Sequence, residues 1–382
     1  MSKANILPRF ILMLVPCIFL LSDMYYQGIG RPFDYISIVI LLLCAFTLGF
    51  SGVGKSMVAY GLPLFTMSLA GIVIGFFNGN ALASFAILTG VLLVLPITVS
   101  LVRQGQRHHF ESAVYLAIWI SIFFFYVQLV AYYNFGAYLD YSSFFGSIES
   151  RGVNVSLNYF RPHGIFQEPN GYCTSMFCLL TLTKYFLVRR KALEYMAILS
   201  LFLSLSLWGM AAAVLLLVCL NSRFSLKAFV SLSMLSVIIF YAFVSLDWID
   251  LASNSITLNR ILNVENDASF SQRSGNFNIL ATELDNSFLW GFGINTNSFQ
   301  GMYGANGLSF LVYSFGIIGT ILLLITLSVM LRFSLLPLLF LALLLTTYPP
   351  FSYMYFWMWL GVLIIIGRRG HQFNYKNLGQ GV

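Results

Sequence analysis

Seven residues of types that shape or perform chemistry, two prolines, two glycines, an arginine, a histidine and a glutamate, lie within one stretch of this 382-residue chain, residues 161–172, which we expect to form half of an active site. It reads Arg161-Pro162-His163-Gly164-Ile165-Phe166-Gln167-Glu168-Pro169-Asn170-Gly171-Tyr172. A carboxylate such as that of Glu168 can accept the proton of an attacking hydroxyl group, and His163 is a second candidate base because histidine titrates near neutrality. The guanidinium of Arg161 can bind phosphate oxygens bidentately. A simpler interpretation is a capped helix with a surface Glu–Arg pair.

A second polar stretch, residues 247–305, adds two cations, Arg260 and Arg273, that could bind the same kind of anion. Its carboxylates, which could replace Glu168 as the base, include Asp267, Glu283 and Asp285. Neither stretch contains a cysteine or a paired acidic motif for a metal. We therefore predict no metal and no other cofactor, with arginines neutralising an anionic leaving group.

The elements that must position these residues are hydrophobic helices. The chain is 59% hydrophobic and 9% charged, with a mean hydropathy of +0.85, whereas soluble domains carry about 25% charged residues. Apolar runs of about 20 residues fit a hydrocarbon core that only helices or closed barrels can cross. The pattern predicts an all-α polytopic membrane protein, one domain over residues 1–382. The expected spans are 6–22, 35–51, 57–77, 81–102, 112–134, 171–188, 228–246, 305–331, 334–348 and 352–367.

The segment 193–220 is too long for one span and short for two, and the distribution of basic residues decides its course. Both of its flanks are basic, and basic loops stay in the cytoplasm. The segment should therefore turn back near Trp208-Gly209, which gives about 12 transmembrane helices with both termini inside. The larger loops, 135–170 and 247–305, then face the periplasm. The five outward-facing cations are Arg31, Arg151, Arg161, Arg260 and Arg273. The net charge of +7 thus reports orientation in a membrane, and we expect no nucleic-acid partner.

One motif is misleading. Residues 49–56 satisfy the phosphate-binding pattern G-x-x-x-x-G-K-[ST]. That mechanism needs a strand before the pattern and a soluble helix after it, and here both neighbouring runs are expected to span the membrane. We interpret residues 49–56 as a glycine-rich cytoplasmic turn.

Two groups of residues resemble a known family. The pattern Arg-x-x-Gly-x-Phe-x-Glu-Pro-Asn, at 161–170 before a membrane helix, is similar to the signature of the O-antigen polymerase and ligase superfamily. Leu289-Trp290-Gly291-Phe292-Gly293, followed by Asn306-Gly307 and by Gly316-Ile317-Ile318-Gly319, resembles that family's Gly-x-Gly loop end and the helix after it. Ligases of the family typically have His-Asn where this chain has Ala305-Asn306, which favours a polymerase of the Wzy type.

The resemblance implies an enzyme of the bacterial inner membrane that joins undecaprenyl-pyrophosphate-linked repeat units into a polysaccharide for lipopolysaccharide. It implies glycosyl transfer with inversion at the periplasmic face, catalysed by Glu168, Arg161 and Arg273. We assign substrate binding to Arg260, His163, Asn170 and Tyr172, and the long apolar helices offer a lateral route for the lipid tails. A chain-length regulator protein is an expected partner.

Two alternatives stay open, an O-antigen ligase that hands the polymer to lipid A core and a flippase for lipid-linked oligosaccharides. Transporters usually carry ionisable residues within their spans, and here the charges cluster in loops and at helix ends. The sequence does not specify the sugar, the linkage, the polymer class or the oligomeric state.

Overall fold

The computed structural model describes residues 6–21, 24, 31–49, 53–55, 58, 69, 87–103, 106–141, 153–154, 159–221, 289–293, 306–347, 351 and 353–369. Over these ranges the regular secondary structure is helical apart from one antiparallel pair of two-residue strands, β1 (Val153–Asn154) and β2 (Tyr159–Phe160). The helices are α1 (Ile6–Pro16), η2 (Cys17–Leu21), α2 (Pro32–Leu48), η4 (Gly90–Val94), α6 (Leu95–Arg103), α7 (Arg107–Phe135), α9 (Pro169–Thr183), α10 (Lys191–Leu203), α11 (Leu207–Asn221), α16 (Gly307–Met330), α17 (Leu335–Leu345) and α18 (Met354–Arg369). The all-α prediction is confirmed for these ranges. Expected spans 57–77 and 228–246 fall almost wholly outside them, so twelve helices stay a prediction.

Two of the described helices, α7 and α16, are long and apolar enough to cross a membrane by length and composition. At 1.5 Å per residue, the 29 residues of α7 extend about 43 Å. The helix ends at Gly136, whose φ of 64° lets its N–H and that of Ala137 bond back to the carbonyls of Tyr132 and Ala131. Shorter apolar helices among the described residues include α2, α11, α17 and part of α18.

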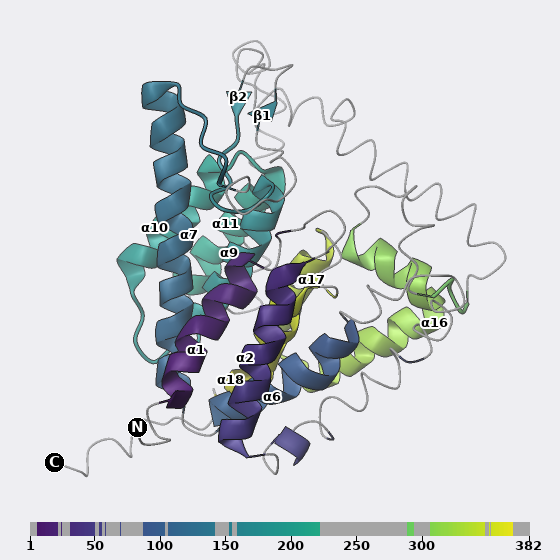
Figure 1. Cartoon of the computed structure of the whole chain (residues 1–382). Coiled ribbons are helices and arrows are strands. Elements are labelled where there is room, and N and C mark those ends of the chain that lie inside the picture. Colours follow the sequence, from purple (N-terminus) through teal and green to yellow (C-terminus); the bar gives the residue numbers. More distant parts are fainter. Residues whose placement is uncertain are drawn as a thin grey trace.

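Helix α9 lies at the centre of the described helices and is buried from Tyr172 to Thr183. It packs against α7, α10, α11 and α18, as Figure 1 shows. Its hydroxyl groups are satisfied within the packing. Thr174 and Thr183 donate to carbonyls in the preceding turn of α9, and Thr181 also accepts from the indole N–H of Trp359 at 2.8 Å. Bonds of this kind make a polar helix compatible with an apolar interior.

Helices α10 and α11 form a hairpin whose two outer ends lie on one side. The Tyr195 hydroxyl donates to Asn221 Oδ1 at 2.5 Å, and Arg189 donates to the Leu220 carbonyl at 2.6 Å. The predicted reversal of segment 193–220 is therefore confirmed, but the turn occupies residues 204–206 and not Trp208-Gly209. Leu205 takes the left-handed conformation there with a φ of 53°. Gly209 serves packing instead, because a Cβ at that position would lie 2.5 Å from Cys173 Sγ.

Helices α1, α2, α6 and α18 form a second group. Within it α1 contacts α2 and α18 contacts α6, and the group meets the first one where α1 contacts α7 and α18 contacts α9. Ser175 of α9 donates to the Phe19 carbonyl in η2 and so joins the two groups. Helix α2 ends at Leu48, immediately before Gly49 with its φ of 77°. A helix and not a strand thus precedes residues 49–56, which argues against the phosphate-binding motif. Residues 53–55 are helical and the rest of the segment after Gly49 lies outside the described residues, so the turn stays a prediction.

Candidate active site

The first predicted stretch forms a compact loop between β2 and α9, and it lies against the second half of α7. At Gly164 the backbone of the loop comes close to the backbone of α7. The φ of Gly164 is 61°, and a Cβ there would lie 3.4 Å from the backbone nitrogen of Phe125 and 3.5 Å from the Ser121 carbonyl. A side chain at this position would be strained because φ is positive, although these distances are ordinary van der Waals contacts. The glycine therefore provides the left-handed backbone with which the loop meets α7.

A buried amide on α7, Gln128, fixes this loop. Its Oε1 accepts the backbone N–H groups of His163 and Gly164, both at 2.8 Å. Its Nε2 donates to the Leu139 carbonyl at 2.7 Å and lies 3.5 Å from His163 Nε2. Gln128 is fully buried, so these bonds form away from water, where an unpaired amide is costly. Gln128 thus joins both ends of the loop region, 136–140 and 163–164, to one helix.

His163 is fully buried, and it holds the turn of the loop together. Its Nδ1 lies 2.5 Å from the Phe166 carbonyl, which can only accept, so Nδ1 carries the proton and Nε2 faces Gln128. Burial lowers the pKa of His163 to about 4, although the Phe166 carbonyl and Asp140 act in the opposite direction. The imidazole is therefore neutral at physiological pH. Direct contact between His163 and a substrate would require this turn to open.

Glu168 stands at the N-cap of α9 with an extended backbone, and Pro169 occupies the first helical position as the Glu-Pro-Asn sequence predicts. Its side chain caps no backbone N–H. It is partly exposed, and among the described residues it makes no hydrogen bond or ion pair. As far as the described part of the chain goes, the carboxylate is therefore available to a ligand.

Arg161 lies near the same end of α9. It is half-buried, and its charge acts on both the imidazole of His163 and the thiol of Cys173. These two groups lie on either side of the Glu168–Pro169 junction in the sequence. Arg161 and Glu168 thus lie in the same short loop before α9, and the charge of Arg161 reaches the first turns of that helix.

The start of α9 is held by three serines of the α10–α11 hairpin. Ser206 Oγ donates to Asn170 Oδ1 at 2.6 Å, Ser204 Oγ lies 3.1 Å from Cys173 Sγ, and Ser200 bonds the Tyr172 hydroxyl. The side-chain oxygen of Asn170, Oδ1, is thereby engaged, while the side-chain Nδ2 makes no bond to a described residue. Tyr172 is fully buried and stacks on Phe125 at a centroid distance of 4.8 Å. In this arrangement Tyr172 supports the helix and does not reach the surface.

The second motif group lies close by and is joined to the hairpin. The Trp208 indole donates to Thr346 Oγ1 at 3.0 Å, and the next residue, Thr347, accepts the Gly307 N–H at 2.7 Å. Asn306 caps α16 by accepting the Ser309 N–H. The starts of α9, α11 and α16 are therefore connected through a short series of contacts, with Asn170 at one end and Asn306 at the other.

The Gly-x-Gly segment 289–293 docks on a kink in α16. At Gly316 the backbone takes φ 62° and ψ −176°, which interrupts the helix. The Tyr313 and Ser314 carbonyls released by the kink accept the N–H groups of Phe292 and Gly293, at 2.8 and 3.0 Å. The backbones meet so closely that a Cβ on Gly291 would lie 2.4 Å from Gly316 N. Two glycines are thus required at this crossing.

Two of the predicted site residues, Arg260 and Arg273, lie outside the described residues, as do the substitute carboxylates of the second stretch. Their roles stay predictions. Among the described residues no three His, Cys, Asp or Glu side chains gather where they could hold a metal ion. Sequence reasoning missed Gln128 and Ser206. A lone glutamine within the apolar run 112–134 was the available signal, because polar residues in such runs are retained for specific partners.

Comparison with known protein families and with curated proteins does not identify the chain, because no family model and no curated protein matches it.

Proposed function

We propose that this chain is a Wzy-type O-antigen polymerase of the bacterial inner membrane, with its site at the periplasmic face. The observation that carries the proposal is the Glu168 carboxylate. It makes no bond to a described residue, stands at the start of a rigidly held helix, and has Arg161 near the same helix end. A carboxylate that has no partner among the described residues, in the same short loop as a guanidinium, suits proton removal from a hydroxyl group together with stabilisation of an anionic leaving group.

In the proposed reaction, the growing polysaccharide on undecaprenyl pyrophosphate is the donor, and a single lipid-linked repeat unit is the acceptor. A hydroxyl oxygen of the acceptor's distal sugar forms a bond to the donor's anomeric carbon. The bond from that carbon to the pyrophosphate oxygen breaks, and undecaprenyl pyrophosphate leaves with the electron pair. Glu168 takes the hydroxyl proton. Attack opposite the pyrophosphate inverts the anomeric centre.

The remaining residues support these steps. Arg161, with Arg273 and Arg260 from the second loop, neutralises charge as it develops on the pyrophosphate. The Asn170 amide group, oriented by Ser206, can donate to a sugar hydroxyl. His163 contributes by holding the loop in place. The lipid tails stay among the apolar helices, and a chain-length regulator would contact a face that no residue here identifies.

A lipopolysaccharide gel of a strain lacking this gene, complemented with wild-type protein or with Glu168→Gln, tests the proposal. We expect deletion to collapse the ladder to core plus one repeat unit, and we expect Glu168→Gln to restore none of it while remaining in the membrane. Arg161→Ala should lower the turnover rate by about 100- to 1000-fold, as loss of one preorganised donor does. Arg161→Lys is the matched control for charge without bidentate geometry.

The same gel separates the alternatives. Loss of all repeat units from the core would contradict the polymerase proposal. Accumulation of polymer on undecaprenyl pyrophosphate would then indicate a ligase, and accumulation of single units on the cytoplasmic side would indicate a flippase. Full-length polymer from Arg161→Ala would exclude the role given to that residue.

A further inference from the structure

The loop between α9 and α10, residues 184–190, lies at the opposite end of α7 from the candidate active site. A buried glutamate of α7 fixes its first part. Glu111 accepts the Leu187 N–H through both carboxylate oxygens, at 3.2 and 3.3 Å. Arg107 pairs with Glu111 at 2.8 Å and also donates to the Tyr185 carbonyl. The charge of Glu111 is thus neutralised, and the loop backbone is fixed.

A second buried glutamate, Glu194 of α10, fixes the last part of the loop. It pairs with Arg189 and accepts the Tyr115 hydroxyl of α7 at 2.8 Å. The same hydroxyl accepts the Arg190 N–H at 2.9 Å. Tyr115 and Gln128 are 13 residues apart on α7, about 20 Å along the helix. This loop therefore forms a separate surface from the site around Glu168.

The side chains that this framework leaves outside are apolar and cationic. Leu187 and Val188 are 63% and 70% exposed. Arg190 and Lys191 are also exposed, and among the described residues neither has a carboxylate partner. Arg190 lies over the Tyr115 ring with 5.2 Å between its guanidinium carbon and the ring centroid. Because both nearby glutamates are paired, the described part of this surface carries a positive charge that no described carboxylate compensates, next to exposed apolar groups.

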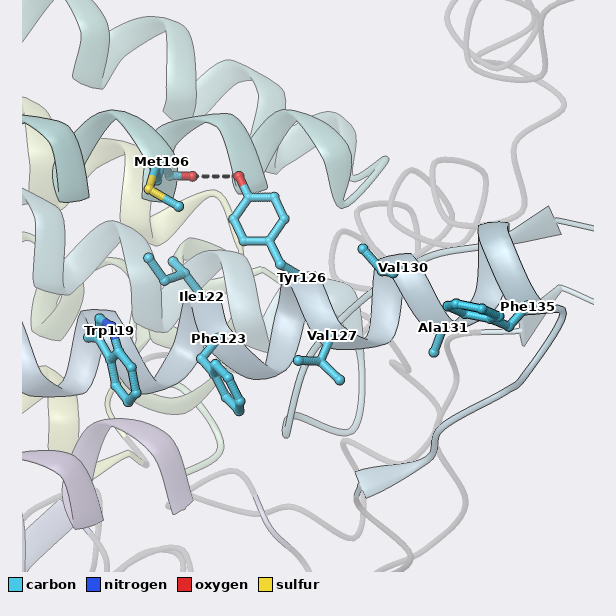
Figure 2. A pocket seen from close by; sticks show the side chains of 9 residues that line it. All are labelled: Trp119, Ile122, Phe123, Tyr126, Val127, Val130, Ala131, Phe135 and Met196. Carbon is cyan, nitrogen blue, oxygen red and sulfur yellow. Dashed lines mark hydrogen bonds between the residues drawn. The ribbon is translucent and has the colours of Figure 1, made fainter.

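An apolar groove of about 500 Å³ begins one turn further along α7, at Trp119. Figure 2 shows Trp119, Phe123 and Val127 along one face of α7, while Tyr126 reaches across to the backbone of α10 at Met196. Met196 is five residues after Lys191 and also lines the groove. A molecule with an anionic head at Arg190 and Lys191 would therefore find an apolar surface for its chain directly beside it.

We propose that Arg190 and Lys191 form a binding site for the head group of an anionic phospholipid, with an acyl chain in the groove between Trp119 and Met196. Two adjacent cations are opposite in sign to a phosphodiester head group, and Leu187 and Val188 fit the boundary between head groups and hydrocarbon. The occupant is a bilayer phospholipid. It is distinct from the lipid-linked sugars of the proposed reaction, whose pyrophosphate belongs at the other end of α7.

Titration of the purified full-length chain with phosphatidylglycerol, monitored as lipid adducts by native mass spectrometry, tests this site. Phosphatidylcholine with the same acyl chains is the zwitterionic comparison. We expect tighter binding of phosphatidylglycerol, and about 25-fold weaker binding by the Arg190→Gln/Lys191→Gln variant, since each basic side chain contributes about fivefold near an anionic lipid. Filling the groove by Val127→Trp should weaken binding of both lipids.

Lys55→Gln/Arg332→Gln is the matched control, because it removes two exposed cations elsewhere and should leave phosphatidylglycerol binding unchanged. Equal loss in the control would mean that only general surface charge attracts the lipid, and unchanged binding in the Arg190/Lys191 variant would exclude the site. Undecaprenyl phosphate can also be added as a competitor of phosphatidylglycerol. If it displaces phosphatidylglycerol from the wild-type protein, and the Arg190→Gln/Lys191→Gln variant no longer binds it, these cations belong to the polyprenyl substrate and the proposal is overturned. None of these results depends on polymerase activity.

Discussion

At the scale of single residues, Gln128 makes the loop of the candidate site depend on α7. Its side chain accepts the backbone N–H groups of His163 and Gly164 in the loop before α9, and it donates to the Leu139 carbonyl in the segment after α7. Gln128→Leu keeps a similar size but leaves the His163 and Gly164 N–H groups buried without an acceptor, at about 1–3 kcal/mol each. We expect faster hydrogen exchange at residues 161–166 and a reduction of the polymerase activity that we propose. Val127→Leu, at the adjacent position of α7, should change neither the hydrogen exchange of these residues nor the activity. Exchange as slow as in the wild type in Gln128→Leu would contradict the inference that Gln128 fixes the loop.

His163 should make closure of the same loop dependent on pH. Its pKa is about 4 in the closed loop because of burial, and it returns to 6.5 when the loop opens. The closed state is therefore fully favoured above pH 6.5, and it loses stability as the pH falls from 6.5 towards 4, by about 3 kcal/mol at most. Limited proteolysis of the loop across this range measures the effect. A His163→Gln protein should show no change with pH in this window.

Sequence reasoning located the loop residues but could not decide which of them face water. Glu168 at the helix start followed from Pro169 and Asn170, because proline and a carboxylate favour the first turn. The burial of His163 and Tyr172 did not follow, because it depends on Gln128 and Ser200, partners 35 and 28 positions away. Those contacts are set by how the helices pack, and the sequence next to His163 and Tyr172 carries no pattern that would reveal them.

At the scale of elements, the docking of segment 289–293 on α16 depends on the glycine pair. In Gly316→Ala, the new Cβ would lie 2.3 Å from the Leu289 carbonyl oxygen on a backbone with φ 62°. The strain alone is about 1–3 kcal/mol, and the overlap adds to it. We expect a lower melting temperature and loss of activity. Gly54→Ala, where a Cβ meets nothing within 4 Å, should behave like the wild type. A stable, active Gly316→Ala protein would mean that the kink is not needed.

At the scale of the whole molecule, the hairpin of α10 and α11 sets the direction of everything after it. Reporter fusions after Arg190 and after Asn221 should give the same sidedness, because both positions lie at one end of the hairpin. Opposite sides would show that segment 193–220 crosses the membrane once and would reverse the later loops. The basic flanks were enough to predict the reversal, whereas the position of the turn was not, because Leu205 carries no glycine signal for its left-handed backbone.

Helix α7 is bonded near both of its ends, through Tyr115 to the loop before α10 and through Gln128 to the loop before α9. A single uninterrupted helix transmits a tilt along its full length, and a helix of about 43 Å is longer than a hydrocarbon core of about 30 Å. Bilayers of different thickness would change that tilt. The thickness of the surrounding membrane would thereby become a mechanical input to the geometry around Glu168.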